Sequence, residues 1–271
     1  MNGRPAHVTI GPHRISVTVS GAGGPAVVIE PAFGGSAQSW QAVARTLSQE
    51  TTVVTYDRAA YGTSSRAMDG RTPREIARDL HGVLDAAGIA RPAVLVGHSA
   101  GGVYIRAFAG LHGGEVAGMV LVDSSHEAQE DVLRGCLPWR IRFLEAVTVP
   151  LLMIVPRGVR GGADRRSIVR EFLSGKRLTA ADQPLAEGAL GDRPLIVLTR
   201  GPGRGGTVAE DWRRWHGLHE DLARLSANSR HVVAGQPGHY IHKSEPGLVT
   251  DAILEVVRSA RARSPLADPA A

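Results

Sequence analysis

Residues 94–102 read VLVGHSAGG, and the rest of the chain is interpreted outward from this stretch. Its first three residues predict a buried strand, and the residues from Ala100 onward have the apolar pattern of a helix. Gly97, Ser99 and Gly101 stand between the two with the spacing G-x-S-x-G. A serine at a sharp strand-to-helix turn needs glycine on both sides, because a Cβ two residues away would collide with the backbone. The stretch therefore predicts an exposed serine at the N-terminus of a helix.

The context of this pentapeptide is stronger evidence than the pentapeptide itself, since a chain with 33 glycines produces such spacings by chance. Continuous apolar runs, typical of strands buried on both faces of a parallel sheet, occur at residues 26–29, 52–56, 93–96, 116–122 and 195–198. Helical patterns separate them at residues 36–47, with Ser36 as the expected cap, and at 72–87 and 100–111. The alternation predicts a doubly wound α/β sheet with right-handed crossovers, preceded by an antiparallel hairpin over residues 8–19.

The regular alternation stops after Val122, and about 70 residues pass before Pro194 begins the next strand. We therefore expect residues 1–123 and 193–262 to form the core and residues 124–192 to form a lid. An ordinary pair of crossover helices is the alternative for the inserted segment. Residues 263–271 have little to bury and are expected to form a flexible tail.

These features together resemble the α/β-hydrolase superfamily over residues 8–257. The resemblance implies the α/β-hydrolase fold, with a mostly parallel eight-stranded sheet, helices on both faces and an inserted lid. Residues 27–36 read VVIEPAFGGS and are followed by Trp40. This stretch is similar to the family's strand that ends in His-Gly-x, although Pro31 and Ala32 replace His-Gly here.

The family stabilises the oxyanion of acyl transfer with two backbone N–H groups. The resemblance assigns these donors to Phe33 and Ala100, and because both are backbone groups, the departure from His-Gly does not by itself remove them. Residues 56–64 read YDRAAYGTS and are similar to the family's Asp-Arg-x-x-x-Gly-x-Ser loop. We interpret that loop as structural and expect a buried ion pair between Asp57 and Arg58.

A serine nucleophile needs a base with a pKa near neutrality, which histidine provides. The chain has eleven histidines, and His239 follows a strand-like segment at residues 231–233 and precedes a terminal helix. The family has its histidine at that place. His242 is the alternative base, and His98, which fills the x of the motif, is expected to be a packing or surface residue.

The third member of such a site is a carboxylate between the serine and the histidine in chain order. The usual position after residues 195–198 offers no acid, whereas Asp123 ends the preceding strand, a place that some members of the family use. We therefore predict Asp123. Glu210 or Asp211 is the alternative, if the loop from Gly201 folds back.

The sequence implies no cofactor. Residues 201–206 are glycine-rich but lack both the lysine of a P-loop and the spacing of a dinucleotide site. His216 and His219 lie three residues apart with no third ligand cluster beside them, so we expect no metal site. Cys136 stands alone and is expected to be a packing residue.

Charge and hydropathy limit the partners. The formal net charge is +5 and the pI about 10, but the arginines are scattered among acidic residues and lack interleaved aromatics, so we expect no nucleic-acid partner. No stretch approaches the length of a transmembrane helix, and the N-terminal residues lack a secretory pattern. We expect a cytoplasmic protein that acts on a small molecule without a membrane partner.

The sequence therefore predicts a serine hydrolase in which Ser99 attacks a carbonyl carbon, His239 transfers the proton and Asp123 orients the imidazole. An ester or lactone is preferred over an amide because its leaving group needs less protonation, and the apolar residues 151–154 favour a partly apolar substrate. An amidase or peptidase, a thioesterase or a carbon–carbon bond hydrolase would use the same residues. A non-catalytic small-molecule receptor is the alternative from another class. Dehalogenases and epoxide hydrolases are disfavoured because those relatives have aspartate where Ser99 stands.

Overall fold

The computed structural model describes residue 3 and residues 5–67, 71–129, 185–203 and 206–267. Within these residues one sheet of eight strands has the order β1-β2-β4-β3-β5-β6-β7-β8. The strands are Ala6–Ile10 (β1), His13–Ser20 (β2), Val27–Glu30 (β3), Val53–Asp57 (β4), Ala93–His98 (β5), Val116–Val122 (β6), Leu195–Thr199 (β7) and Ser229–Val233 (β8). β1 and β2 form an antiparallel hairpin, and β2 is antiparallel to β4. The remaining neighbours are parallel, which confirms the predicted mostly parallel sheet.

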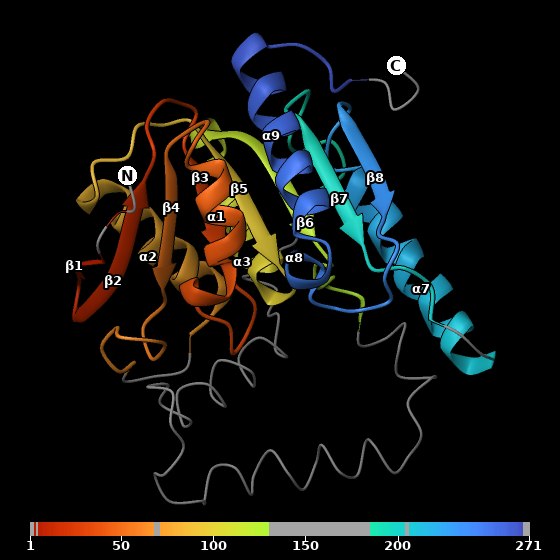
Figure 1. The fold of residues 1–271 in the computed structure, drawn as a ribbon, viewed down its shortest axis with the longest axis horizontal. Helices are drawn as coiled ribbons and strands as arrows, with labels where there is room; N and C mark the ends of the chain where they lie inside the picture. The colour runs from red at the N-terminus through yellow and green to blue at the C-terminus, as the bar shows by residue number, and fades with distance from the viewer. Residues whose placement is uncertain (1–2, 4, 68–70, 130–184, 204–205, 268–271) are drawn as a thin grey trace, which may run out of the picture.

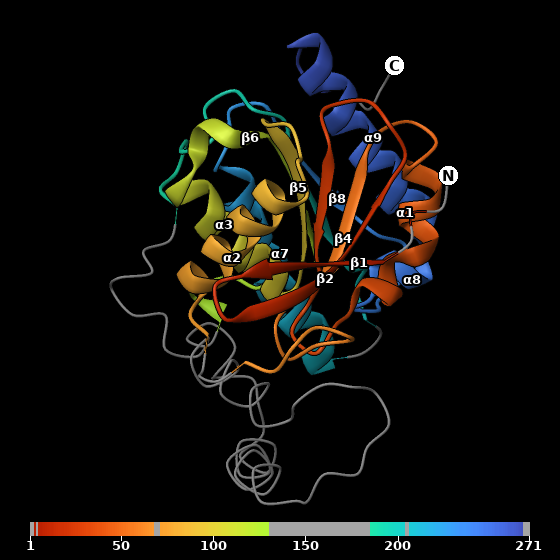
Figure 2. The ribbon, with the colours of Figure 1, turned by 90° about the vertical axis from the view of Figure 1, so that its left-hand side faces the viewer.

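Helices cover both faces of this sheet. They are Gln41–Leu47 (α1), Pro73–Ala86 (α2), Ala100–Leu111 (α3), Gly206–Ala223 (α7), Ile241–Ser244 (α8) and Pro246–Ala262 (α9), with short 3-10 helices at Ala37–Trp40 and Gly113–Glu115. Figure 2 shows α1, α8 and α9 on one side of the strands and α2, α3 and α7 on the other. Each side has its own apolar cluster. All residues of β3, β5 and β7 are buried, as continuous apolar runs predict for central strands.

The start of two helices shows what local sequence determines. α2 begins with a capping box, in which Thr72 and Glu75 bond to each other's backbone N–H groups. The helical segment predicted from Ser36 is instead a 3-10 turn followed by α1, and the Ser36 side chain makes no capping bond. The N–H of Ala37 donates to Asp57 Oδ1 at 2.8 Å, so the cap comes from the end of β4.

The carboxyl ends of the parallel strands meet at one edge of the sheet, where the arrowheads of β4, β5, β7 and β8 point downward in Figure 1. Ser99 directly follows β5, Asp123 directly follows β6, and His239 lies in the segment between β8 and α8. Candidate sites in open α/β sheets lie at this edge.

Most of the predicted lid, with Cys136 and the apolar residues 151–154, lies outside the described residues. At the other end, residues 264–267, predicted to be part of a flexible tail, return to β8. The N–H of Leu266 donates to Asn228 Oδ1 at 2.9 Å, and Arg230 donates to the carbonyl of Ala267 at 3.0 Å. None of the described helices combines the length and apolar character that crossing a membrane requires.

Candidate active site

Ser99 is held in a strained backbone conformation between β5 and α3. Its φ is 54° and its ψ is −123°, a region that non-glycine residues rarely adopt. The N–H of Ser99 donates to the carbonyl of Val122 at 3.1 Å, and its carbonyl accepts from the N–H of Ser125 at 2.9 Å. Strand β6 and the residues after it therefore fix the turn on both sides.

The two glycines of the motif are required by contacts with the backbone. A Cβ on Gly97 would lie 2.7 Å from the carbonyl oxygen of Gly101. A Cβ on Gly101 would lie 2.3 Å from the carbonyl oxygen of Glu30, at the end of β3. The steric reason predicted for G-x-S-x-G is thus present at both positions.

Asp123 follows β6 and is completely buried, with a φ of 40°. Its Oδ1 accepts from Trp215 Nε1 at 2.7 Å and from the N–H of Arg200 at 3.2 Å. Its Oδ2 accepts from His239 Nδ1 at 2.5 Å and from the Arg200 guanidinium at 3.0 Å. Burial raises the pKa of Asp123, but the His239 bond, the charge of Arg200 and the Trp215 bond outweigh burial and hold this pKa at about 2. The carboxylate is therefore ionised at neutral pH.

His239 lies between Asp123 and solvent, with 34% of its side chain exposed. Because Nδ1 donates to Asp123, the lone pair of the neutral ring is on Nε2. The loop that carries His239 is fixed from two directions. The backbone carbonyl of His239 accepts from His98 Nε2 at 2.9 Å. The side chain of Glu245 accepts from the N–H groups of Gly235 and Gln236 at 3.1 and 2.7 Å.

The alternative candidates lie elsewhere. His242 is buried, stacks on Trp40 with ring centroids 4.3 Å apart, and has no hydrogen-bond partner among the described residues. Glu210 is exposed and pairs with Arg214 at 2.8 Å. The carboxylate that contacts His239 is therefore that of Asp123.

His98 belongs to a buried aromatic cluster under His239. Its ring is 1% exposed and lies 4.7 Å, centroid to centroid, from both His239 and His242. Burial lowers the pKa of His98 to about 4 and that of His242 to about 3. Both rings are therefore neutral at pH 7, and the predicted packing role of His98 is combined with a hydrogen bond that positions the His239 loop.

The loop that carries Phe33 is fixed by Arg58, but not through the predicted pair with Asp57. The Arg58 guanidinium bonds to Glu30 Oε1 at 2.5 Å and to the carbonyls of Pro31 and Ala32 at 2.8 and 3.1 Å. Glu30 is completely buried at the end of β3 and also accepts from the Tyr56 hydroxyl. The expectation of an Asp57–Arg58 pair was wrong, because Arg58 turns into the sheet while Asp57 caps the turn at Ala37. The sequence contained one indication of the Glu30–Arg58 pair, because Glu30 is a charged residue at the end of the apolar run at residues 26–29.

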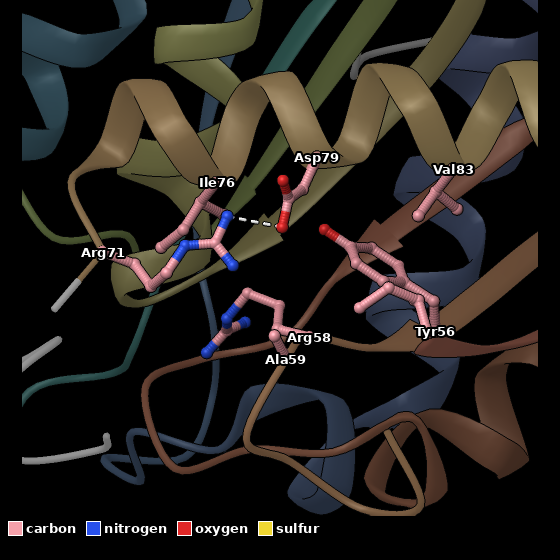
Figure 3. A pocket seen from close by; sticks show the side chains of 8 residues that line it. Tyr56, Arg58, Ala59, Arg71, Ile76, Asp79 and Val83 are labelled. Carbon is pink, nitrogen blue, oxygen red and sulfur yellow. Dashed lines mark hydrogen bonds and ion pairs between the residues drawn. The ribbon is translucent and has the colours of Figure 1, made fainter. Parts of the chain in front are cut away.

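A cavity of about 10 Å³ lies beside this buried pair, between β4 and α2. Figure 3 shows Tyr56 and Arg58 facing Ile76, Asp79 and Val83 of α2, with Arg71 paired to Asp79. The cavity has room for about one water molecule and not for a substrate. A groove of about 680 Å³ over β2, β4 and α1 is lined by neither Ser99 nor His239.

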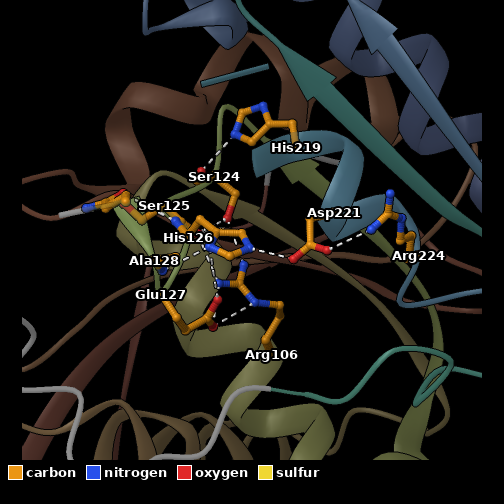
Figure 4. A network of polar contacts seen from close by, with 10 residues as sticks. Arg106, Ser124, Ser125, His126, Glu127, Ala128, His219, Asp221 and Arg224 are labelled. Atoms are coloured by element: carbon orange, nitrogen blue, oxygen red, sulfur yellow. Dashed lines mark hydrogen bonds and ion pairs between the residues drawn. The ribbon is translucent and has the colours of Figure 1, made fainter. Parts of the chain in front are cut away.

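The residues that follow Asp123 are held by a polar network that the sequence did not predict (Figure 4). Arg106 of α3 is buried and bonds to Ser124 Oγ at 2.9 Å, to the carbonyl of Ser125 at 3.0 Å and to Glu127 at 2.7 Å. Burial raises the pKa of Glu127, and the paired Arg106 charge outweighs that effect and lowers it. His126 reaches Asp221 of α7 at 3.0 Å. The network joins the end of β6 to helices α3 and α7.

The expected absence of a metal site rested on His216 and His219, and the structure separates these two residues. His219 is completely buried and bonds to Thr199 and to the carbonyl of Ser124. His216 instead lies near Glu220 and His231, and one ligand atom from each of these three side chains lies within 4.8 Å of the others. Spacing along the sequence did not reveal this cluster because His231 comes from β8.

Comparison with known proteins agrees with the fold and with the hydrolase class. The family model for the alpha/beta hydrolase fold matches residues 25–146. YqjL of Bacillus subtilis is 26% identical over 236 residues, which are 87% of this chain and 85% of YqjL. A protein of Azorhizobium caulinodans that carries the name carbamate hydrolase RutD is 32% identical over 148 residues, 52% of this chain and 55% of RutD. A thermophilic esterase from Thermogutta terrifontis has a TM-score of 0.66 and 22% identity, and the alignment covers 95% of this chain and 99% of the esterase.

The fold and the constellation at the carboxyl edge define an α/β-fold hydrolase. The family model and the shared fold support the α/β-hydrolase superfamily for this chain, as the sequence predicted. Structural likeness at 22% identity shows the fold, so the bond that is cleaved has to be argued from the residues of this chain.

Proposed function

We propose that this protein is a serine hydrolase that cleaves a carboxylic ester or lactone of a small, partly apolar substrate through an acyl-enzyme. Ser99 is the nucleophile, His239 the base and Asp123 the residue that orients it, while the N–H groups of Phe33 and Ala100 stabilise the oxyanion. The observation that carries the proposal is the hydrogen bond between the buried Asp123 and the partly exposed His239, beside the strained turn of Ser99. A base oriented by a third group is the usual arrangement around an activated serine.

The proposed reaction has two halves. Ser99 Oγ attacks the carbonyl carbon and its proton moves to His239 Nε2, which forms an imidazolium next to the Asp123 carboxylate. The carbonyl oxygen becomes an oxyanion, and each backbone donor aimed at it contributes about 3 kcal/mol to transition-state stabilisation. When the intermediate collapses, the leaving alkoxide takes the proton from His239. Water then attacks the acyl-enzyme by the same proton transfers and regenerates Ser99.

Two properties of Asp123 support this assignment. Its pKa of about 2 keeps it a carboxylate throughout, so it can stabilise the imidazolium without taking the proton. Its Trp215 and Arg200 partners hold the carboxylate in one orientation, which in turn sets the tautomer of His239.

The first test is labelling with a fluorophosphonate followed by mass mapping of the adduct. We expect the adduct on Ser99 in the wild type, none at this position in Ser99→Ala, and much slower labelling in His239→Ala and Asp123→Asn. Ser125→Ala is the matched control, because this serine lies beside the same turn, and it should label like the wild type. A folded wild type that leaves Ser99 unlabelled contradicts the proposal and favours the receptor.

The second test concerns the bond. A panel of acetyl and butyryl esters, a lactone, a carbamate and an anilide includes the reactions named for the relatives. We expect the highest kcat/KM for an ester or lactone. A carbamate or anilide hydrolysed faster than every ester would replace the proposed substrate class and leave the roles of Ser99 and His239 in place.

A further inference from the structure

We propose that His216, Glu220 and His231 form a binding site for a divalent transition-metal ion of the Zn²⁺ type. The three side chains come from α7 and β8, and one ligand atom of each lies within 4.8 Å of the other two. Two imidazoles and one carboxylate are a donor set that suits zinc. None of these residues belongs to the proposed triad, so the inference does not depend on the proposed function.

The two ligands on α7 are spaced for a common ion. His216 and Glu220 are four residues apart, which brings their side chains to the same face of a helix. His216 Nδ1 and Glu220 Oε1 are 3.4 Å apart. Two ligands bound to one tetrahedral Zn²⁺ at about 2.0–2.1 Å would be separated by roughly the same distance. The pair therefore needs little movement to bind an ion.

The third ligand approaches from the sheet. The ring centroids of His216 and His231 are 4.6 Å apart, and His231 is on β8, against which α7 packs. Three protein ligands leave a fourth tetrahedral position for water. A bound ion would thus join α7 to β8.

A chain of buried hydrogen bonds keeps one nitrogen of His231 unprotonated. The carbonyl of Ser124 can only accept, so His219 Nε2 donates to it at 2.9 Å and the lone pair of the neutral ring is on Nδ1. The Thr199 hydroxyl then donates to His219 Nδ1 at 2.5 Å and accepts from His231 Nε2 at 2.5 Å. The lone pair of His231 is therefore on Nδ1. Histidine ligands of metals commonly donate their other N–H in this way, which fixes tautomer and ring orientation.

A second cluster of the described residues provides the contrast. His81, His112 and Glu115 also bring three ligand atoms within 4.8 Å of one another. There, however, Arg91 Nε lies 3.4 Å from Glu115 Oε2, and a guanidinium at that distance opposes the binding of a cation. Within the described part of the chain, Glu220 forms an ion pair only with His216. Charge therefore favours the cluster on α7 and β8.

The test is metal titration of the full chain without a polyhistidine tag, with Zn²⁺ by calorimetry and Co²⁺ by visible absorption. We expect the wild type to bind one equivalent, and His216→Gln and Glu220→Gln to bind at least tenfold more weakly. Glu220 is 58% exposed, so its replacement by glutamine should leave the fold intact, as circular dichroism will check. His81→Gln is the matched control and should bind like the wild type.

A third readout is thermal. Zn²⁺ at about 100 times its Kd should raise the wild-type Tm by roughly 5 °C and leave that of Glu220→Gln unchanged. The proposal is overturned if the wild type takes up no stoichiometric metal ion, if His81→Gln loses binding instead, or if the Co²⁺ complex shows the intense thiolate band of a cysteine ligand. Activity of the enzyme enters none of these readouts.

Discussion

Asp123 shows at the scale of one residue how a fully buried carboxylate stays charged. The rings of Trp215 and His239, together with the backbone N–H and the guanidinium of Arg200, donate to its two oxygens. These bonds outweigh the effect of burial, which would raise the pKa of the carboxyl group. An asparagine of the same shape would be neutral and would present an NH₂ group to part of this ring of donors. It would also favour the tautomer of His239 that carries its proton on Nε2, where the proposed reaction needs a lone pair.

We predict that Asp123→Asn lowers kcat on an ester substrate by roughly 10⁴-fold, the size of the effect known for this change in serine triads. Asp221→Asn is the matched control, because Asp221 is in the neighbouring polar network and is 55% exposed. It should keep kcat within about twofold. An Asp123→Asn variant with more than a tenth of wild-type kcat would remove Asp123 from the proposed mechanism.

The sequence pointed to the proposed serine and histidine more directly than to the proposed acid. The contacts of Ser99 are local, since Gly97 and Gly101 lie within two residues of it. Choosing Asp123 over Glu210 required the order of strands, because β6 lies beside β7 and only their adjacency brings Asp123 to Arg200 and to the His239 loop. The chain alone gives this order only through family resemblance.

At the scale of one element, α3 depends on glycine where it passes β6. A Cβ on Gly102 would lie 2.0 Å from Ser124 Oγ and 2.7 Å from its Cβ, and that hydroxyl is already fixed by Arg106. Further along the same helix, a Cβ on Gly110 would meet only Leu185 Cδ2, at 3.6 Å. Gly102 and Gly110 are therefore on the same helix, but only Gly102 lacks room for a Cβ.

We predict that Gly102→Ala lowers the free energy of unfolding by about 2–3 kcal/mol, because the helix must move away from Ser124. Gly110→Ala should raise it by about 0.5–1 kcal/mol, because alanine has the higher helix propensity and meets no obstacle. Urea unfolding at pH 7 measures both changes. Equal effects in the two variants would mean that helix propensity, and not the contact with Ser124, decides the change in stability.

The starts of helices illustrate what remains hidden at this scale. The start of α2 could be predicted from Thr72, Pro73 and Glu75, because both capping bonds are made within four residues. The turn at Ala37 is capped by Asp57, twenty residues away. The prediction that Ser36 caps this segment was therefore wrong. Arg58 likewise found Glu30 through the pairing of β3 with β4 and not through its neighbour in sequence.

For the whole molecule, buried neutral histidines make stability depend on pH. Burial lowers the pKa of His98 to about 4 and that of His242 to about 3, from an ordinary value of 6.5. Between pH 6.5 and about 4 these two histidines are protonated in the unfolded chain and neutral in the folded chain. The stability that the neutral rings contribute is therefore complete above pH 6.5 and is lost as the pH falls.

We predict that the free energy of unfolding drops by up to about 3 kcal/mol per pH unit across this range from these two residues together, at about 1.4 kcal/mol per proton. His242→Phe should reduce the measured slope by about 1.4 kcal/mol per pH unit, while His98, His219 and His231, whose pKa values burial lowers to about 4, keep contributing to it. It should also raise stability at pH 7 by about 1 kcal/mol, since neither ring nitrogen of His242 has a partner among the described residues. Urea titrations at pH 7, 6 and 5 measure the slope, and a stability independent of pH would contradict the burial of both rings.

The fold as a whole was predictable because most of its strands are continuous apolar runs with helices between them. The strand-helix alternation therefore identified the sheet before any contact was known. The hairpin strands β1 and β2 were recognised from the turn between them. The edge strand β8 was recognised from only three residues, since its side chains are half-buried or exposed. The proposed metal site could not be found without the tertiary structure, because His216 and Glu220 lie on α7 and His231 lies on β8.

Helix α9 covers part of the same sheet face as α1, and its late position in the chain matters for folding during synthesis. Ile253 and Val256 of α9 belong to the same apolar cluster as Val94 and Val120, and α9 contacts β5, β6 and β7. The strands leave the ribosome before α9 does, so the part of the nascent sheet that α9 covers stays exposed until Pro246–Ala262 has been made. A chain that stalls before α9 would keep that apolar surface exposed and would be prone to aggregate. Because α9 follows β5, β6 and β7 in the chain and covers them in the fold, we predict that the nascent chain depends on chaperones.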